Sequence, residues 1–216
     1  MPRTAARVLV ECLLAQGVTT AFGVPGESYL AVLDALHDVP DRIRMIANRQ
    51  EGGAAFMAAA WGKLTGRPGI CFVTRGPGAT NAAIGVHTAR QDSSPMILFV
   101  GQIATSMRDR EAFQEVDYRA VFGTLAKWAV EIDHPDRVPE LVARAFAVAR
   151  TGRPGPVVVA LPEDMLTAPT EAVAGPPVRI PKAAPAAEDL AEIARLIEGA
   201  EAPLVLAGGG GWGAAA

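Results

Sequence analysis

The stretch GICFVTRGPGATNAAIGVHTARQDSSPMILFVG (residues 69–101) decides the fold, because it holds two uninterrupted apolar runs joined by a helical segment. The runs GICFVT (69–74) and PMILFVG (95–101) do not alternate between apolar and polar residues, which is typical of strands buried on both faces of a parallel sheet. A strand, a helical crossover and a second strand form the repeating unit of α/β proteins. The stretch therefore predicts an open, doubly wound, mostly parallel sheet with helices on both faces.

The same alternation extends outward over residues 4–160. Thr4 can cap a first amphipathic helix, and Ser28 can cap the helical segment SYLAVLDALH (28–37). Ligands of such sheets bind at the carboxyl ends of the strands. Further strands are expected at AFGV (21–24), IRMIAN (43–48), KWAVEI (127–132) and GPVVVALP (155–162), and further helices after Glu51, at 118–122 and at VPELVARAFAVAR (138–150). Because ligands bind at the carboxyl ends of the strands, the candidate ligand-binding segments are the loops 24–27, 48–51 and 74–81 and the segment from Gly101 onward.

The composition changes near the end of the chain. Residues 166–187 are rich in Pro and Ala and have little periodicity, so they are interpreted as a semi-extended linker between residues 1–165 and 188–216. The helical pattern EDLAEIARLIEGA (188–200) and the strand pattern PLVLAG (203–208) then resemble the opening of a second α/β domain. A single helix and strand cannot bury their own apolar faces, so we expect the chain to be cut short of that domain.

Charge and composition exclude several classes of function. The chain has 216 residues, a formal net charge of −3 and no basic run, so we expect no nucleic-acid partner. No apolar run approaches the length of a membrane span and the N-terminus is too polar for a signal peptide, so a cytoplasmic protein without membrane contact is expected. Cys12 and Cys71 lie in apolar patterns and are interpreted as buried free thiols. No residue is assigned to a metal site in this chain, since its three histidines are far apart.

Glu51 opens the run EGGAAFMAAAWGKLTG, which is otherwise almost entirely Gly, Ala and large apolar residues. Asn48 could be the N-cap of this helix, with Glu51 its partner in a variant of the capping box. The capping interpretation leaves Gly52, Gly53 and Gly62 unexplained, because each costs roughly 1 kcal/mol against Ala inside a helix. Close approach of another surface is the usual reason for such glycines.

The segment GPGATN (76–81) follows a strand and opens a helix, a place where backbone can approach a ligand closely. It is a poor dinucleotide fingerprint, since Asn81 replaces the third Gly and no acidic residue ends the following strand. It is not a P-loop either, because it lacks the Gly-Lys-Ser/Thr ending. Taken alone, it fits a plain turn with Pro77 at the first helical position about as well as a ligand loop.

Four motifs occur together in a fixed order: GVPGE (23–27), RQEGGAAFMAAAWGKLTG (49–66), VTRGPGATNAAIGVHTARQDSSPMILFVGQ (73–102) and REAFQEVDY (110–118). Together they resemble the N-terminal, pyrimidine-binding domain of thiamin-diphosphate-dependent enzymes, most closely that of the acetolactate synthase large-subunit group. The resemblance covers the chain from end to end. It implies a pyrimidine domain over 1–165 and the beginning of that family's middle domain over 188–216.

The resemblance implies that Glu51 is catalytic. In this family a carboxylate bonded to N1′ of the cofactor's aminopyrimidine promotes the imino tautomer, whose nitrogen takes the C2 proton. The resulting carbanion adds to a 2-oxo acid, CO₂ leaves, and the acyl group passes to a second carbonyl or a proton. The resemblance also implies a homodimer or tetramer formed through the helix at 51–65. Mg²⁺ is expected from a missing C-terminal domain, because no Gly-Asp-Gly motif occurs in this chain, and FAD is left open.

The remaining residues are carried over position by position. Gln114 matches a residue of the reaction site and is assigned to both catalysis and cofactor binding. Glu27 departs from the family's second Gly and, with Ser28 and Phe113, is assigned to the substrate pocket. The cofactor-binding assignments are Pro25, Gly26, Glu51, Thr74, Pro77, Gly78, Asn81 and Gln114.

Three other interpretations stay open at this stage. The chain could belong to another decarboxylase or acetyltransferase of the same superfamily that acts on a different substrate. It could be a truncated, non-catalytic chain that serves as a binding or dimerisation module. A plain nucleotide-binding α/β domain is disfavoured by the missing glycine and acidic residue. On its own, the chain is expected to be inactive, because it supplies the activating carboxylate without the metal site.

Overall fold

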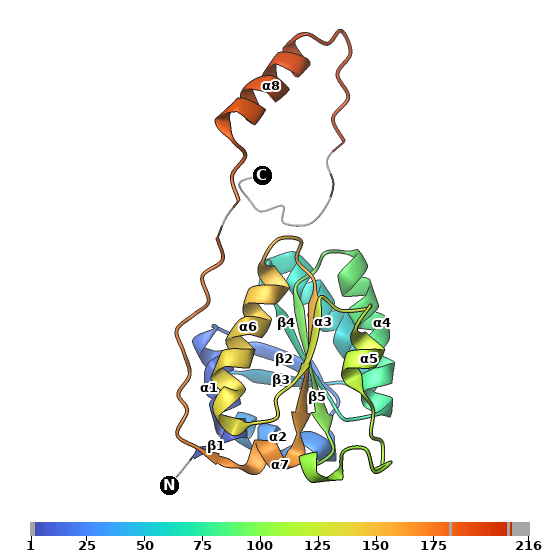
Figure 1. The fold of residues 1–216 in the computed structure, drawn as a ribbon, viewed down its shortest axis with the longest axis vertical. Coiled ribbons are helices and arrows are strands. Elements are labelled where there is room, and N and C mark those ends of the chain that lie inside the picture. The colour runs from blue at the N-terminus through green and yellow to red at the C-terminus, as the bar shows by residue number, and fades with distance from the viewer. Residues whose placement is uncertain (1–2, 182, 207, 209–216) are drawn as a thin grey trace.

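The computed structural model describes residues 3–181, 183–206 and 208. Its centre is a six-stranded sheet in the order β3-β2-β4-β5-β7-β6, in which every neighbouring pair is parallel. The predicted doubly wound parallel sheet is therefore confirmed (Figure 1). The strands are β2 (Thr20–Gly23), β3 (Arg44–Ala47), β4 (Gly69–Val73), β5 (Met96–Gln102), β6 (Trp128–Glu131) and β7 (Pro156–Pro162).

Helices cover both faces of the sheet, as the apolar strands require (Figure 1). One face carries α1 (Ala5–Ala15), α2 (Leu30–His37) and α6 (Val138–Arg150). The other face carries α3 (Glu51–Thr65), α4 (Pro77–Gln91) and α5 (Tyr118–Phe122). The shorter elements are β1 (Arg3–Thr4), β8 (Pro169–Thr170), α7 (Glu163–Thr167) and the 3₁₀ turns η1 (Glu27–Tyr29), η2 (Thr105–Met107) and η3 (Pro135–Arg137).

Each face of the sheet has its own hydrophobic core. Phe72 on β4 stacks on Phe99 of β5 with ring centroids 4.9 Å apart, and Tyr29 continues the stack at 5.9 Å. This core is filled mainly by branched and aromatic side chains. On the other face the helices contribute mostly alanines, so α3 and α4 lie close to the strands and to each other. Both cysteines are buried and unpaired, which confirms the predicted free thiols.

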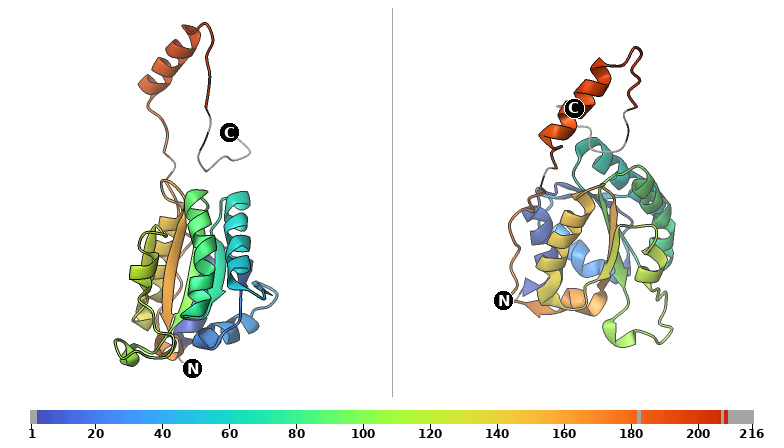
Figure 2. Two further views of the ribbon diagram at one scale, coloured as in Figure 1. Left: turned by 90° about the vertical axis from the view of Figure 1, so that its right-hand side faces the viewer. Right: turned by 45° about the horizontal axis from the view of Figure 1, so that its top comes forward.

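Glycines allow the close packing of α3 and α4, which Figure 2 shows side by side in its left view. A Cβ added to Gly62 would lie 2.0 Å from the carbonyl oxygen of Pro95, and one on Gly85 would lie 2.4 Å from Cβ of Ala55. These positions need glycine because of contacts within the chain. Gly53 differs, since a Cβ there would meet no atom within 4 Å. The expected close approach of another surface is therefore confirmed for Gly62, and that surface belongs to the same chain.

The strand order places the carboxyl ends of β2 and β4 side by side at a reversal of the sheet. From β2 the chain crosses to β3 at the edge, and from β3 it returns past β2 to β4. Because α2 and α4 lie on opposite faces, the chain leaves the neighbouring ends of β2 and β4 toward opposite sides of the sheet, and ligands of open α/β sheets bind at such a position. Loops 24–27 and 74–76 border this position, as the sequence predicted.

The end of the chain matches the prediction in part. The helix is present as α8 (Ala187–Glu198), but residues 203–206 and 208 form no strand, so the predicted strand at 203–208 is wrong over the described residues. A strand needs a neighbour to bond with, and these residues have none. Residue 207 of the same prediction lies outside the described part. The domain boundaries stay predictions. No helix in the described part of the chain is long and apolar enough to cross a membrane.

Candidate functional site

Glu51 is the first residue of α3, directly after the loop that follows β3. The N-cap is Gln50, whose side-chain oxygen accepts a 2.9 Å hydrogen bond from the backbone amide of Gly53. The expectation that Asn48 caps this helix is wrong, because its side-chain amide donates instead to the carbonyl of Ile46 at 2.9 Å. Gln50 performs the capping, and the carboxylate of Glu51 lies at the positive end of the helix dipole.

Asn81 on α4 reaches the carboxylate of Glu51. Its side-chain nitrogen donates a 3.0 Å hydrogen bond to Oε2 of Glu51. The other oxygen, Oε1, lies 3.5 Å from the place that a Cβ on Gly78 would occupy, and that place is 2.9 Å from Cγ2 of Thr74. A side chain at position 78 would therefore fill the space beside the carboxylate. The glycine leaves a cradle whose walls are Glu51, Thr74 and the start of α4.

The loop after β2 packs tightly against the loop after β4. Ser28 is fully buried, its hydroxyl lies 2.8 Å from that of Thr74, and it accepts a 3.1 Å bond from the backbone amide of Arg75. A Cβ added to Gly26 would lie 2.5 Å from Cβ of Thr74. The expectation that Ser28 caps a helix is wrong, because η1 intervenes and α2 starts at Leu30. Ser28 instead lies beneath the site and joins its two loops.

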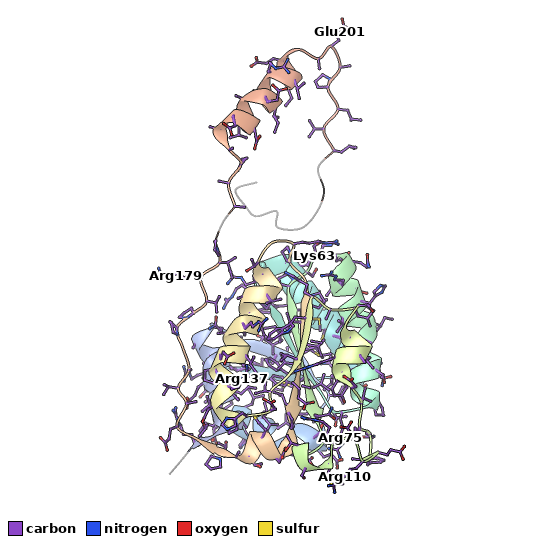
Figure 3. The ribbon with its side chains drawn as sticks, in the orientation of Figure 1. Lys63, Arg75, Arg110, Arg137, Arg179 and Glu201 are labelled. Carbon is purple, nitrogen blue, oxygen red and sulfur yellow. The ribbon has the colours of Figure 1, made fainter. Side chains whose placement is uncertain are left out.

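Arg75 is the site residue that the sequence reasoning missed. Its guanidinium is largely buried and forms ion pairs with Glu27 at 2.8 Å and Glu163 at 3.1 Å. Its Nε donates a 3.1 Å hydrogen bond to the backbone carbonyl of Phe113. Figure 3 shows Arg75 at the carboxyl end of the sheet. A signal was available, since an arginine follows one strand and glutamates follow two other strands whose carboxyl ends meet at the same edge.

Gln114 lies against the first turn of α4. A Cβ added to Gly76 would lie 2.8 Å from Cβ of Gln114, and the backbone amide of Gly76 donates a 2.8 Å bond to the hydroxyl of Tyr118. Burial raises the pKa of Tyr118 to about 12, against smaller lowering effects of this hydrogen bond and of the nearby Arg75 charge. Gln114 has a φ of 65°, a left-handed conformation that costs a non-glycine residue about 1–3 kcal/mol. Its neighbour Phe113 is 73% exposed.

The sequence-predicted residues thus gather around the loop between β4 and α4. Contacts made by Asn81, Thr74 and Ser28 connect one group of predicted site residues. Arg75 and Gly76 connect further predicted site residues to this group. Pro25 and Pro77 are exposed members of the same loops. The connected set is Gly26, Ser28, Glu51, Thr74, Gly78 and Asn81, with Glu27 and Phe113 joined through Arg75 and Gln114 joined through Gly76.

A cavity of about 300 Å³ lies apart from the cradle at Glu51, between the loop that follows β5 and strand β6. Its charged side chains include Arg108 and Glu131, which form an ion pair with each other. Gln102 closes one end, with its side chain bonded to the carbonyl of Val116 at 2.9 Å. Among residues 3–181, 183–206 and 208, no group of three or more His, Cys, Asp or Glu side chains is arranged to hold a metal ion.

Comparison with known families identifies the domain. The family model described as "Thiamine pyrophosphate enzyme, N-terminal TPP binding domain" matches residues 3–121. The chain belongs to the thiamine pyrophosphate enzyme family. The matched range covers the strands from β2 to β5, the cradle at Glu51 and the loop that carries Gln114.

Relatives within the family include acetolactate synthases. The chain is 40% identical over 205 residues to the acetolactate synthase of Bacillus subtilis, and the aligned region covers 94% of this chain and 35% of that protein. It is 38% identical over 209 residues to the large subunit of acetolactate synthase isozyme 1 of Escherichia coli, covering 96% and 37%. The mitochondrial catalytic subunit of Saccharomyces cerevisiae is 38% identical over 165 residues, covering 76% and 24%. The chain spans about a third of the length of the first two relatives.

Proposed function

We propose that this chain is the pyrimidine-binding part of a thiamin-diphosphate-dependent carboligase or decarboxylase of the acetolactate synthase type. Glu51 is its activating acid. The observation that carries this proposal is the cradle at Gly78, in which Oε1 of Glu51 borders a space that a Cβ would fill. The identity to acetolactate synthases over nearly the whole chain supports the reaction class.

The residues of this chain have separate tasks in the proposal. Glu51 holds the proton that it shares with ring nitrogen N1′ of the pyrimidine, and Asn81 holds the second carboxylate oxygen so that the group keeps its orientation. Thr74 and Gly78 shape the wall against which the ring lies. When bound, thiamin diphosphate supplies a nucleophilic carbon that adds to the carbonyl of a 2-oxo acid and stabilises the electron pair released with CO₂. Gln114 lies at the edge of the site, where the substrate would enter.

We propose that the diphosphate and its Mg²⁺ bind to a part of the protein outside this chain. This part is expected to be a segment comparable to the two thirds of the relatives that the chain does not span. The 216-residue chain alone is then inactive and binds thiamin diphosphate weakly, with or without Mg²⁺. Titration calorimetry measures this directly. Binding as tight as that of a complete enzyme would contradict the proposal that the metal site lies elsewhere.

A second copy of the chain is the proposed partner of the outer face of α3 and α4. Phe56, Met57 and Leu64 on α3 and Ile84 on α4 are exposed apolar side chains on this face. Gly53 lies on it as well and has open space around it. Exposed apolar side chains that gather on neighbouring helices are typical of an association surface. Since α3 begins at Glu51, association here would bring the second copy close to the cradle.

The experiment that tests the catalytic proposal replaces Glu51 with Gln in the full-length protein that contains this chain. Exchange of the C2 proton of bound thiamin diphosphate is followed by NMR after acid quench. We expect Glu51→Gln to slow the exchange by about 10²–10⁴, the usual contribution of a positioned general acid or base. Glu140→Gln on the exposed surface of α6 is the matched control and leaves the rate unchanged. Exchange at the wild-type rate in Glu51→Gln would reduce Glu51 to a helix-terminal charge.

A further inference from the structure

Arg75 connects three loops that follow three different strands. The residue lies two positions after the end of β4 and is 8% exposed. One nitrogen of its guanidinium bonds to Glu27 after β2, another to Glu163 after β7, and Nε bonds to the carbonyl of Phe113 in the loop after β5. These bonds use the planar fork of arginine in three directions, which a lysine ammonium cannot reproduce.

The loop after β5 contains several strained residues. Asp109, Glu111 and Gln114 all have positive φ, at 61°, 52° and 65°. Such conformations persist in non-glycine residues only where the surrounding contacts fix them. Glu115 supplies contacts from within the loop, because its carboxylate accepts bonds from the backbone amides of Asp109 at 2.7 Å and Ala112 at 3.0 Å. Gln114 takes part in neither of these bonds, so an attachment from outside the loop would fix it.

Arg75 provides this attachment beside Gln114. The carbonyl of Phe113, which accepts the bond from Arg75, belongs to the peptide unit that joins Phe113 to Gln114. A rotation of that peptide would change the φ of Gln114 and break the bond to Arg75. The other side of Gln114 is limited by Gly76, the residue after Arg75, where a Cβ would come within 2.8 Å of Cβ of Gln114. Two consecutive residues of the β4–α4 loop therefore determine the position of Gln114.

Arg75 is the cation that pairs with two carboxylates, those of Glu27 and Glu163. One guanidinium faces two carboxylates, so its loss would leave Glu27 and Glu163 without their shared cation. Both carboxylates are partly exposed to solvent, at 63% and 48% of their side chains, and could then turn outward. Glu27 would thereby leave the edge of the site. The same arginine thus fixes a backbone position in one loop and an acidic side chain in another.

We infer that Arg75 is a positioning residue of the reaction site, which holds Gln114 and Glu27 in place without contacting the cofactor. The inference rests on the proposed function for its catalytic consequence. The bonds of the Arg75 side chain go to Glu27, Glu163 and Phe113, and none of these residues borders the cradle at Glu51. Loss of the Arg75 side chain should therefore impair the use of substrate more than the binding of thiamin diphosphate. Arg75 acts on the substrate side of the site.

The first test uses the 216-residue chain itself and needs no activity. Hydrogen exchange of backbone amides is compared between wild type, Arg75→Met, Arg75→Lys and a control, Arg110→Met. The control alters an exposed arginine of the loop after β5, the loop that contains Gln114 (Figure 3). We expect the amides of Asp109, Ala112 and Glu115 to exchange at least tenfold faster in Arg75→Met, with β4 and β5 unchanged. The lysine variant shows a smaller local increase and serves alone if the methionine variant does not fold. Unchanged loop amides, or an equal loss of protection across the whole sheet, would overturn the inference.

The second test measures steady-state kinetics of the same variants in the full-length protein. Arg75→Met is expected to lower kcat about tenfold or more, while the half-saturating concentration of thiamin diphosphate stays within about twofold. Arg75→Lys recovers part of kcat, and Arg110→Met matches wild type. A wild-type kcat in a variant with a loosened loop would refute the positioning role. If the wild-type protein itself shows no turnover, the proposed function fails, and the exchange experiment still decides whether Arg75 holds the loop.

Discussion

Asn81 and Glu51 are 30 positions apart in the sequence, and the side-chain amide of the first donates a 3.0 Å hydrogen bond to Oε2 of the second. The bond joins the first residue of α3 to the fifth residue of α4, beside the space left by Gly78. One carboxylate oxygen is thereby held by the protein, and the other faces the cradle. This arrangement makes the orientation of Glu51 dependent on a neutral side chain of a different helix.

Replacing Asn81 with Leu keeps the size of the side chain but removes the donor to Glu51. Hydrogen bonds to charged groups contribute about 1.5–3 kcal/mol when buried, and the exposure of Asn81 reduces this, so we expect about a tenfold slower exchange of the cofactor C2 proton in the full-length protein. Thr88→Val on the same helix is the control, since its hydroxyl bonds only to the carbonyl of Ile84. Equal rates in wild type and Asn81→Leu would mean that Glu51 keeps its orientation unaided.

Glycine-to-alanine substitutions on α3 and α4 should divide into two opposite classes. Gly85→Ala is expected to destabilise the fold by about 1–3 kcal/mol, because the added methyl would lie 2.4 Å from Cβ of Ala55 in a packed interface. Gly53→Ala has open space around it and is expected to stabilise the chain by about 0.5–1 kcal/mol through helix propensity. Urea unfolding measures both values in the background of Met57→Lys, the variant that is expected to be monomeric. A stabilising Gly85→Ala would show that the two helices can separate at little cost.

Stability should fall as the pH rises above about 9. Burial, with a smaller effect of the Glu11 charge, raises the pKa of Cys12 from 9.0 to about 12, and burial raises that of Tyr118 from 10.0 to about 12. Between these values the unfolded chain releases protons that the folded chain retains, so the free energy of unfolding decreases with pH. The contribution is complete below pH 9 and is lost as the pH approaches 12. Urea midpoints from pH 8 to 11 measure the slope, which Cys12→Ala should reduce; an identical slope would assign the effect to other groups.

The sequence predicted the sheet well because burial of both faces leaves a direct trace in the residues. The central strands β4, β5 and β7 were found from apolar runs such as GICFVT and PMILFVG, whereas the edge strands β3 and β6 were found from IRMIAN and KWAVEI, which also carry charged residues. The run PLVLAG has the same character, yet no strand forms over its described residues, because pairing depends on a neighbour that the pattern does not reveal. Apolar composition therefore indicates the capacity to form a strand, and the rest of the chain decides whether one forms.

The site was predictable where a role depends on residue type and less so where it depends on distant partners. Glu51, Asn81 and Gly78 were selected from motifs, and the structure brings them together. The N-cap was assigned to Asn48 instead of Gln50, because local rules favour Asn at this position and do not include Gln among the preferred caps. Arg75 was missed, since its partners Glu27 and Glu163 lie 48 and 88 positions away and only the order of the strands makes them neighbours.

The outer face of α3 and α4 should mediate self-association of the chain. Met57→Lys places a charge among the exposed apolar residues of this face, where Met57 is 46% exposed, and is expected to convert a dimer into a monomer. Met107→Lys is the matched control, because Met107 is 43% exposed but lies on η2, away from these helices. Sedimentation equilibrium gives the masses, and circular dichroism confirms that both variants are folded. A wild-type chain that stays monomeric at high concentration would contradict the assignment, whereas dissociation by Met107→Lys alone would move the interface to the loop after β5.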